Sequence, residues 1–429
     1  MRVLAGDIGG TKTAVAIAEV RSGTLSLLRT SRYPSGAWDG LDEIVEDFLS
    51  VEESRPAAAA FGVAGPVRDG RAKVTKLPWS IDERRLARRL DIRQVHVLND
   101  FVAAALGIPR LSPRKLTVLV PGKTEPGAPI GVIGAGTGLG QAALVRVHGG
   151  WIAFASEGGH ADFGPRDERE DRLVRFVRAR FGRVSRDRLL SGEGLGHIYD
   201  FLKSDRGADD NPAVARAFSE GDRAAAISRF ALSGRDPLCR DALDMFVSIY
   251  GSEAGNLAIQ YRATGGIYVT GGIAGKILPE LRQPLFRESF RGKPPMEALL
   301  SQIPVRAIRE PRLGLLGAAD AAYKMAIETT RRRSSKTTTR FKLRLTQRTR
   351  GPRSSRTVSI SPGSPRRCRT SDSDIPSWIA PTGFSWSSMM TWLASPTTRL
   401  CSDSLTAARE PRSGRVRSST MPETVGRFS

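Results

Sequence analysis

The sequence predicts an α/β protein of two domains, each with a central β-sheet covered by helices. Three observations point to this class. Short buried apolar runs alternate with amphipathic helical patterns from residue 2 to residue 328. Glycine-rich turns follow several of the predicted strands. The chain has 429 residues, which is enough for two domains, since one domain usually takes roughly 100–200 residues.

The first domain is expected at residues 1–110 and is the smaller of the two. Unbroken or alternating apolar positions predict its strands, and apolar residues three to four positions apart predict its helices. A last helix at 311–328, with an apolar face, is expected to complete this domain. The predicted strands cover residues 2–8, 13–20, 22–30, 57–65 and 95–98, and the earlier helices cover 41–51, 82–90 and 101–108.

The second and larger domain is expected at residues 111–310, where the alternation continues. Residues 168–262 are mostly helical by pattern, and 238–261 form the longest candidate helix. A strand beginning at Trp151 leads into a polar cluster. The other predicted strands lie at 116–120, 130–136, 141–147, 266–272 and 303–308.

Residues 331–429 differ in character from the rest of the chain. They hold 20 serines and little periodic apolar pattern, so they cannot bury enough apolar surface to offset the entropy lost on folding. They carry 20 Lys and Arg against 5 Asp and Glu, which is +15 of the net charge of +22. A flexible basic tail that binds nucleic acid or membrane is one interpretation. We favour translation of GC-rich DNA in the wrong frame, because Arg, Ser and Pro enrichment accompanies stray Trp and Met.

Composition and targeting signals narrow the class of protein. Outside the tail the net charge is only +7, with no recognition-helix motif, so nucleic acid is not an expected partner. Cys239, Cys368 and Cys401 lie too far apart to predict a disulfide framework or a zinc site. The N-terminus runs directly into a strand, and no apolar run approaches about 18 residues. We therefore expect a cytoplasmic protein without a membrane span.

An acidic residue and two glycines follow one another at the first predicted turn, in Asp7-Ile8-Gly9-Gly10-Thr11. Glycines let backbone N–H groups approach an anion closely, and Thr11 adds a hydroxyl. Asp7 can hold Mg²⁺ through water, since that ion prefers oxygen ligands and keeps much of its hydration. The turn predicts a phosphate and metal site, and a plain hairpin turn is the alternative.

Two further glycine-rich turns follow strands later in the chain. Gly136, Thr137 and Gly138 lie in GAGTGLG, which is neither a Walker A loop nor a dinucleotide fingerprint. Gly271 and Gly272 lie in TGGIAG and leave room for a flat nucleoside base. Each turn alone is equally compatible with an ordinary connection. The joint occurrence of the three turns favours a nucleotide site.

Asn99 and Asp100 stand at the end of a buried strand. Phosphoryl transfer asks a protein for positioning, a metal and a base for the attacking hydroxyl. An aspartate at the carboxyl end of a strand can accept that proton, and Asn99 can donate to and accept from a sugar hydroxyl. The alternative is that Asp100 caps the helix that follows it.

Glu157 and His160 are separated by two glycines in EGGH. A carboxylate and an imidazole this close can face one small polar ligand, and sugar hydroxyls require such paired donors and acceptors. A metal site is less well supported, because the four histidines do not cluster and no cysteine accompanies them.

Together these motifs resemble those of the bacterial ATP-dependent glucokinases, which have a hexokinase–actin-like fold. The resemblance runs from about residue 2 to about residue 325 in the family's order, and EGGHADF with LNDF is its most specific part. The matching segments are LAGDIGGTKT, FGVAGPV, LPWSI, VLNDFVAAALGIP, GAGTGLGQA, SEGGHADFGPRDERE, RLLSGEGL and VTGGIAGKI.

The resemblance implies two domains around a deep cleft and transfer of the γ-phosphate of ATP, with Mg²⁺, to the C6 hydroxyl of glucose. Asp100 would be the general base. Asn99, Glu157 and His160 would bind the other sugar hydroxyls. The residues implied to face the metal, phosphates and adenosine are Asp7, Gly9, Gly10, Thr11, Gly136, Thr137, Gly138, Gly271 and Gly272.

One residue departs from the family's pattern. A glutamate that helps to hold the sugar usually precedes the RxLSG motif, and here the residue is Asp187, one methylene shorter. A weaker sugar contact or a changed epimer preference is expected. The rival function is a sugar-sensing protein of the same fold that has lost catalysis. The preferred hexose, phosphate donors other than ATP, and the oligomeric state, with a homodimer as one option, stay open.

Overall fold

The structure is a computed structural model that describes residues 1–348. Its strands are β1 (Arg2–Ile8), β2 (Lys12–Arg21), β3 (Thr24–Pro34), β4 (Ala59–Val63), β5 (Val67–Arg68), β6 (Arg71–Lys73), β7 (Ser80–Asp82), β8 (Val95–Asn99), β9 (Leu116–Val120), β10 (Ile130–Ala135), β11 (Leu139–Val147), β12 (Gly150–Ser156), β13 (Gly266–Thr270) and β14 (Val305–Ile308). Its α-helices are α1 (Leu41–Leu49), α2 (Glu83–Arg89), α3 (Asp100–Gly107), α4 (Glu168–Phe181), α5 (Gly192–Arg206), α6 (Pro212–Glu220), α7 (Arg223–Leu232), α8 (Pro237–Gln260), α9 (Gly272–Lys276), α10 (Leu278–Leu281), α11 (Pro284–Arg291), α12 (Glu297–Leu300) and α13 (Leu313–Arg348).

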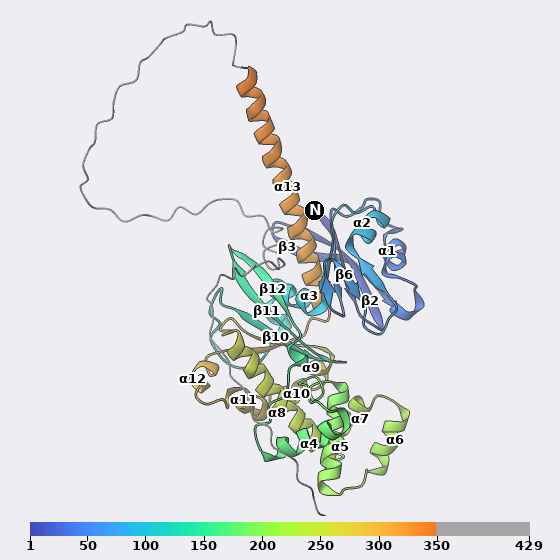
Figure 1. Cartoon of the computed structure of the whole chain (residues 1–429), viewed down its shortest axis with the longest axis vertical. Helices are drawn as coiled ribbons and strands as arrows, with labels where there is room; N and C mark the ends of the chain where they lie inside the picture. Colours follow the sequence, from blue (N-terminus) through green and yellow to red (C-terminus); the bar gives the residue numbers. More distant parts are fainter. Residues whose placement is uncertain (349–429) are drawn as a thin grey trace, which may run out of the picture. The chain divides into compact units, whose positions relative to one another are not determined.

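Two mixed sheets carry the fold (Figure 1). The N-terminal sheet has the strand order β3-β2-β1-β4-β8, and the central sheet has the order β12-β11-β10-β13-β14-β9. A small antiparallel sheet, β5-β6-β7, accompanies them. The α/β class predicted from alternating strand and helix patterns is confirmed.

The N-terminal sheet is covered by helices on both faces. Leu4 and Ile8 of β1 belong to the core that includes α1 and α2. Val3 and Ala5 alternate with them and belong to the core that includes α13. This alternation follows from the period of two along a strand, and it explains why β1 carries apolar residues on both faces, with Arg2 and Asp7 as its polar positions.

The central sheet is also buried on both faces. Ile133 and Val269 pack in the large core that contains most of the buried face of α8. Val132 packs on the opposite face with Ala105 of α3. Because β1 and β10 each have a parallel neighbour, β4 and β13, the carboxyl ends of paired strands lie at one edge of each sheet. Ligand sites of α/β proteins commonly lie at such edges.

Helices α3 and α13 pack closely against each other. A Cβ on Gly317 would lie 1.6 Å from the carbonyl oxygen of Ala103, and one on Gly107 would lie 2.5 Å from that of Leu313. Glycine is required at both positions, because any side chain would push the helices apart. Since α13 covers the N-terminal sheet and α3 covers the central sheet, this contact joins the layers that carry the predicted site.

Two helical regions differ from the sequence-based expectations. Helix α13 continues to Arg348 instead of ending at 328, since no glycine or proline interrupts the chain before Gly351 and Pro352. Helices α9 to α12 were not expected, because they are short and begin near prolines and glycines. From residue 349 onward, the predicted basic tail lies outside the described residues.

Within residues 1–348, no helix has the length and hydropathy needed to cross a membrane. The domain division near residue 110, the homodimer and the cytoplasmic location stay predictions.

Candidate active site

The first glycine turn joins β1 to β2 and is held in place by its neighbours. Ser35 Oγ donates a hydrogen bond to the Gly9 carbonyl at 2.9 Å. A Cβ on Gly10 would lie 2.5 Å from the carbonyl oxygen of Thr75, so only glycine permits this approach of two backbones. Thr11 is exposed at the tip. The turn connects an antiparallel hairpin, and the phosphate and metal site stays a prediction.

Asp7 lies beside this turn near the end of β1. Burial raises the pKa of its carboxyl group, and no residue among 1–348 donates a hydrogen bond or forms an ion pair with it. A Cβ on Gly314 would lie 2.7 Å from Asp7 Oδ2, so glycine keeps this side of the carboxylate open. Asp7 is partly exposed, so a cation or ordered water can reach its carboxylate and complete it.

These properties fit a hydrated divalent cation. Mg²⁺ prefers carboxylate oxygens and keeps several of its own waters. In the part of the chain that the structure describes, no three His, Cys, Asp or Glu side chains gather in a way that could hold a metal directly. Asp7 therefore fits a metal held through water together with a phosphate ligand.

Helix α3 begins at Asp100 and is capped by Asn99. Asn99 Oδ1 accepts hydrogen bonds from the N–H groups of Phe101 (3.0 Å) and Val102 (3.3 Å). The alternative that Asp100 serves as the cap is wrong, because the residue before it has this role. Asn99 Nδ2 also donates to the Gly65 carbonyl at 3.1 Å, so the amide is fixed at both ends.

The carboxylate of Asp100 has an unusual electrostatic environment. Burial is the largest cause that raises its pKa from 3.8 to about 6, and the negative charges of Asp7 and Glu157 add to the rise. A hydrogen bond from the Phe101 N–H, at 2.9 Å, opposes it. The structure therefore places two other predicted acidic site residues, Asp7 and Glu157, within electrostatic range of Asp100.

The second glycine turn connects β10 to β11. The Gly136 N–H donates to the Gly138 carbonyl at 2.8 Å and closes the turn, and Thr137 is exposed at its tip. Asp187 Oδ1 accepts the Leu139 N–H at 2.7 Å. A Cβ on Gly138 would lie 2.8 Å from the same oxygen. Because Gly138 has no Cβ, the carboxylate of Asp187 can lie close to the backbone of this turn.

Phe101 connects α3 to the second glycine turn. A Cβ on Gly134 would lie 2.9 Å from the Phe101 ring, and one on Gly140 would lie 1.9 Å from it. These glycines flank the turn, so the ring packs directly onto the backbone of both strands. Because Phe101 follows Asp100 in the first turn of α3, this packing places Asp100 beside the second glycine turn.

The third glycine turn lies against the second. Gly271 has φ 90° and its Cβ would lie 2.4 Å from the carbonyl oxygen of Ala135, so both conformation and space require glycine. A Cβ on Gly136 would lie 3.9 Å from the Gly272 nitrogen. The contact follows from the parallel pairing of β10 with β13, which puts both strand ends at one edge.

A surface pocket of about 470 Å³ lies at the far end of α9, the helix that begins at Gly272. Its wall is mostly apolar carbon with two basic side chains. The pocket is lined by Ala225, Ser228, Arg229, Leu232, Ser233 and Lys276.

Glu157 and His160 lie on a single turn after β12, around the 3₁₀ helix η4 (Gly158–His160). The His160 N–H donates to the Glu157 carbonyl at 2.9 Å, and both residues are exposed. A Cβ on Gly159 would lie 2.1 Å from the carbonyl oxygen of Leu139. The turn is thus pressed against the first residue of β11, beside the second glycine turn.

Asp187 links the EGGH turn to the second glycine turn. Its backbone N–H donates to the Gly159 carbonyl at 2.7 Å, while its carboxylate accepts the Leu139 N–H. The structure therefore engages this carboxylate with backbone, a role that the sequence-based prediction of a sugar contact did not include.

Three residues that belong to no short sequence motif lie next to the EGGH turn. Arg186, Gln141 and Glu253 form a buried polar group beneath the EGGH turn. Sequence reasoning missed them, because they lie on three separate elements and only folding brings them together.

Several known proteins are similar to this chain. The family model named Glucokinase matches residues 4–325. A glucokinase of Nostoc sp. (strain PCC 7120) is 41% identical over 339 residues, with 75% of this chain and 99% of that protein covered. A glucokinase of Synechocystis sp. is 38% identical over 344 residues, with 74% of this chain and 97% of that protein covered.

Solved structures show the same fold. A glucokinase from an Antarctic psychrotroph has a TM-score of 0.68 at 29% identity, covering 75% of this chain and 99% of its own. A glucokinase of the ROK family from Streptomyces griseus, in complex with glucose and AMPPNP, has a TM-score of 0.51 at 24% identity, covering 76% and 100%. The likeness confirms the predicted sugar-kinase fold. On the match over three quarters of its length, and on relatives covered almost from end to end, the chain belongs to the glucokinase family.

Proposed function

We propose that this protein transfers the γ-phosphate of ATP to the C6 hydroxyl of glucose, giving glucose 6-phosphate and ADP. One observation carries the proposal. Asp100, at the start of α3, has a carboxylate with a pKa of about 6 beside the glycine turns, although it accepts the Phe101 N–H. Such a group is mostly ionised at neutral pH and still basic enough to take a proton as a hydroxyl reacts. The names of the relatives support the same reaction.

In this reaction the C6 oxygen of glucose attacks the γ-phosphorus while Asp100 takes the hydroxyl proton. The new O–P bond forms as the bond to the β,γ-bridging oxygen breaks, and ADP leaves with that electron pair. The proton stays on Asp100 until solvent removes it. Catalysis of this kind rests mainly on positioning and charge stabilisation.

The glycine turns are proposed to hold the triphosphate. Their backbone N–H groups can approach phosphate oxygens, since no Cβ blocks them. Asp7 would hold Mg²⁺ through water, and that ion would offset negative charge on the β- and γ-phosphates. The residues proposed for this end of the site are Asp7, Gly9, Gly10, Thr11, Gly136, Thr137 and Gly138.

Glucose is proposed to lie between Asp100 and the EGGH turn. Glu157 and His160 are exposed there and can pair with sugar hydroxyls. Asn99 keeps one Nδ2 proton for a hydroxyl, because its oxygen caps α3 and its other proton bonds to Gly65. Asp187 has a second carboxylate oxygen for the sugar, and the first holds the Leu139 N–H.

The adenosine end is proposed to pass Gly271 and Gly272 and follow α9. The pocket at the end of that helix has an apolar wall that suits a flat base. Arg229 and Lys276 border it and can attract the negatively charged nucleotide. ATP is favoured as the donor on this basis.

The proposal is tested with Asp100→Ala. Glucose-dependent production of ADP is measured by a coupled assay, and glucose binding is measured by calorimetry. We expect kcat to fall by at least about 100-fold while glucose still binds, since general bases typically contribute about 10²–10⁴-fold. Asp209→Ala, which removes an exposed carboxylate of the same type, is the matched control and should change neither quantity. A wild-type kcat in Asp100→Ala would exclude this residue as the base.

The rival is a sugar-sensing protein without catalysis. The comparisons give it no support, since the curated relatives are named glucokinases. The same assay separates the two functions. Glucose binding to the unaltered chain without any ADP production would favour the rival.

A further inference from the structure

Glu253 carries a buried carboxylate in the middle of α8, and the residue is 3% exposed. It has no contact with substrate in the proposed reaction. It accepts hydrogen bonds from Gln141 Nε2 and Asn256 Nδ2, each at 2.8 Å. Arg186 forms an ion pair with it, also at 2.8 Å. A charge so deeply buried is stable only when paired and hydrogen-bonded, so the three partners depend on Glu253 and it depends on them.

This polar group supports the EGGH turn from below. A Cβ on Gly158 would lie 2.2 Å from Gln141 Oε1, so the backbone of the turn rests directly on that amide. The Gln141 amide is in turn oriented by Glu253. The backbone N–H of Arg186 donates to the Ala161 carbonyl at 3.0 Å, just after the turn. Arg186 therefore binds the turn with its backbone and α8 with its side chain.

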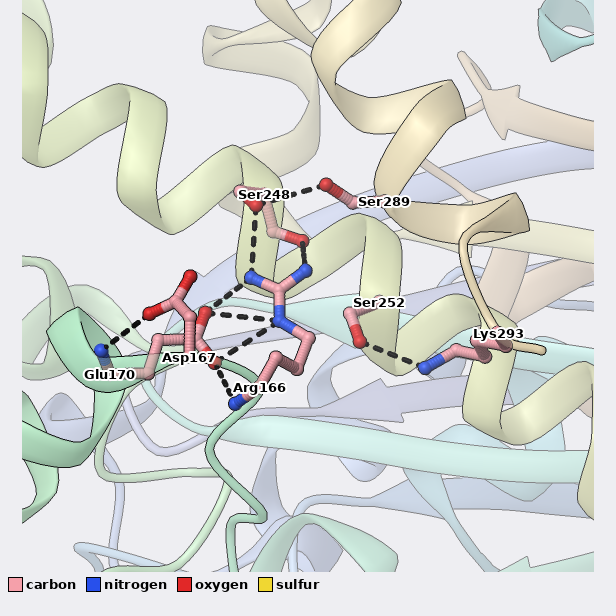
Figure 2. A network of polar contacts seen from close by, with 7 residues as sticks. All are labelled: Arg166, Asp167, Glu170, Ser248, Ser252, Ser289 and Lys293. Carbon is pink, nitrogen blue, oxygen red and sulfur yellow. Dashed lines mark hydrogen bonds and ion pairs between the residues drawn. The ribbon is translucent and has the colours of Figure 1, made fainter.

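The far end of the same loop is attached to α8 as well. Figure 2 shows the guanidinium of Arg166 lying between Glu170 and Ser248. Arg166 Nη2 donates to Ser248 Oγ at 2.9 Å, and its Nε donates to Glu170 Oε1 at 3.0 Å. Ser248 lies on α8, the helix that also carries Glu253. Residues 157–166 are thus anchored at both ends to one long, buried helix.

We propose that Arg186 and Glu253 are positioning residues that hold Glu157 and His160 in the geometry for binding the sugar. They act through the backbone of the EGGH turn and touch neither glucose nor ATP. The naming of glucose as the ligand rests on the function proposed above. Because a mobile turn must be ordered when the sugar binds, loss of the pair weakens glucose binding and leaves the phosphate turns in place.

The test uses Arg186→Met, Glu253→Gln and the double variant in the full chain. Glucose Kd is measured by calorimetry, and kcat and the KM values for glucose and ATP are measured by the coupled assay. Each single change should raise the glucose Kd and KM by about tenfold, with kcat and the ATP KM within about twofold of the unaltered chain. The glucose Kd of the double variant should equal that of the single variant that binds glucose less tightly, because the two residues act as a unit.

A matched control lies on the same helix. Arg240 pairs with Glu280 and Asp244, away from the EGGH turn. Arg240→Met should therefore leave the glucose Kd unchanged even if it lowers the unfolding temperature. A similar rise in glucose Kd in this control would show a general loss of stability and overturn the proposal.

Hydrogen exchange adds a readout that does not need turnover. The His160 amide, which bonds to Glu157, should exchange faster in Arg186→Met and in the double variant than in the control. If Glu253→Gln does not fold, Arg186→Met alone decides. An unchanged glucose Kd in that variant would refute the positioning role. Glucose binding without ADP production in the unaltered chain would refute the proposed kinase function. The comparison of glucose Kd values would still test whether Arg186 and Glu253 position the EGGH turn.

Discussion

Asn99 Oδ1 and Asp100 Oδ1 both accept the Phe101 N–H at the start of α3, and Asn99 Oδ1 also accepts the Val102 N–H. The two residues are adjacent, and either one could have satisfied the first N–H groups of α3. An ionised carboxylate at the cap would accept two N–H groups, and its pKa would fall. Asp100 instead has a raised pKa. Burial is therefore the largest cause of the raised pKa of Asp100, the negative charges of Asp7 and Glu157 add to it, and the Phe101 N–H opposes it.

Asn99→Ala should therefore change both stability and chemistry. Loss of the cap should lower the free energy of unfolding by about 1 kcal/mol, and Asp100 can then turn toward the N–H groups that have lost their acceptor, which lowers kcat. Asn211→Ala is the matched control, because Asn211 caps α6 by accepting the Ala213 N–H at 3.0 Å. Urea unfolding and kcat are measured for both. The explanation is wrong if Asn99→Ala is destabilised like the control and keeps its kcat.

Asp100→Asn should stabilise the fold at neutral pH. The pKa of Asp100 is about 6 in the folded protein and has an ordinary value of 3.8. A raised carboxyl pKa means that the folded state binds the proton more tightly, so the contribution of Asp100 to stability falls as pH rises from about 4 to about 6. The amide removes this cost, which is roughly 1–3 kcal/mol at pH 7.5.

The gain should be largely lost by about pH 3, below both pKa values, where the carboxyl group is mostly protonated in both states. Urea unfolding at the two pH values tests this prediction. Asp209→Asn, at an exposed position, should give no gain at either pH. A gain of equal size at both pH values would show that charge is not the cause.

The proposed reaction should also lose its base in acid. We expect kcat/KM for glucose to fall about tenfold per pH unit below pH of about 6, because the free enzyme then carries a protonated Asp100. A pH profile of kcat/KM from about 5 to 8, corrected for unfolding, measures this fall on the acid side. A profile that stays flat down to pH 5 would contradict the assignment of Asp100.

Much of the fold could be predicted, because its signals are local. The buried runs of β4 and β10 are apolar at every position, and that of β1 is apolar apart from Arg2 and Asp7, as sheets covered on both faces require. Helices α9 to α12 lack such a signal, since each has too few turns to show a period and they pack by tertiary contact. The end of α13 was misplaced because a change in composition at residue 331 does not stop a helix that meets no glycine or proline.

The candidate site was predictable in its parts and less so in its connections. The glycine turns and the pairs LNDF and EGGH stand out as short motifs. Which of Asn99 and Asp100 caps α3 depends on a register of one residue, and both types are good caps. The pairing of Arg186 with Glu253 spans 67 positions and has no sequence signature. Contacts of this kind arise only from the packing of α8 beneath β11.

Gly317→Ala should be strongly destabilising. Its Cβ would lie 1.6 Å from the carbonyl oxygen of Ala103, so α3 and α13 would have to separate. We expect a loss of at least about 3 kcal/mol in the free energy of unfolding, or no folded protein. Gly275→Ala is the control, since nothing lies within 4 Å of its Cβ position in α9 and alanine favours helix. Two variants of equal stability would show that the helices can move apart at little cost.

Substitutions of Asp187 distinguish a residue that contacts the sugar from one that supports the second glycine turn. Its carboxylate holds the Leu139 N–H at the second glycine turn, which is proposed to face phosphate. Asp187→Ala should therefore raise the KM for ATP by roughly tenfold, the effect of losing a hydrogen bond to a charged group. Asp187→Asn keeps an oxygen acceptor and should raise the ATP KM much less. Both KM values are measured at a saturating level of the other substrate. If Asp187→Ala raises only the glucose KM, the residue serves the sugar directly, and the shorter side chain then bears on the choice of hexose.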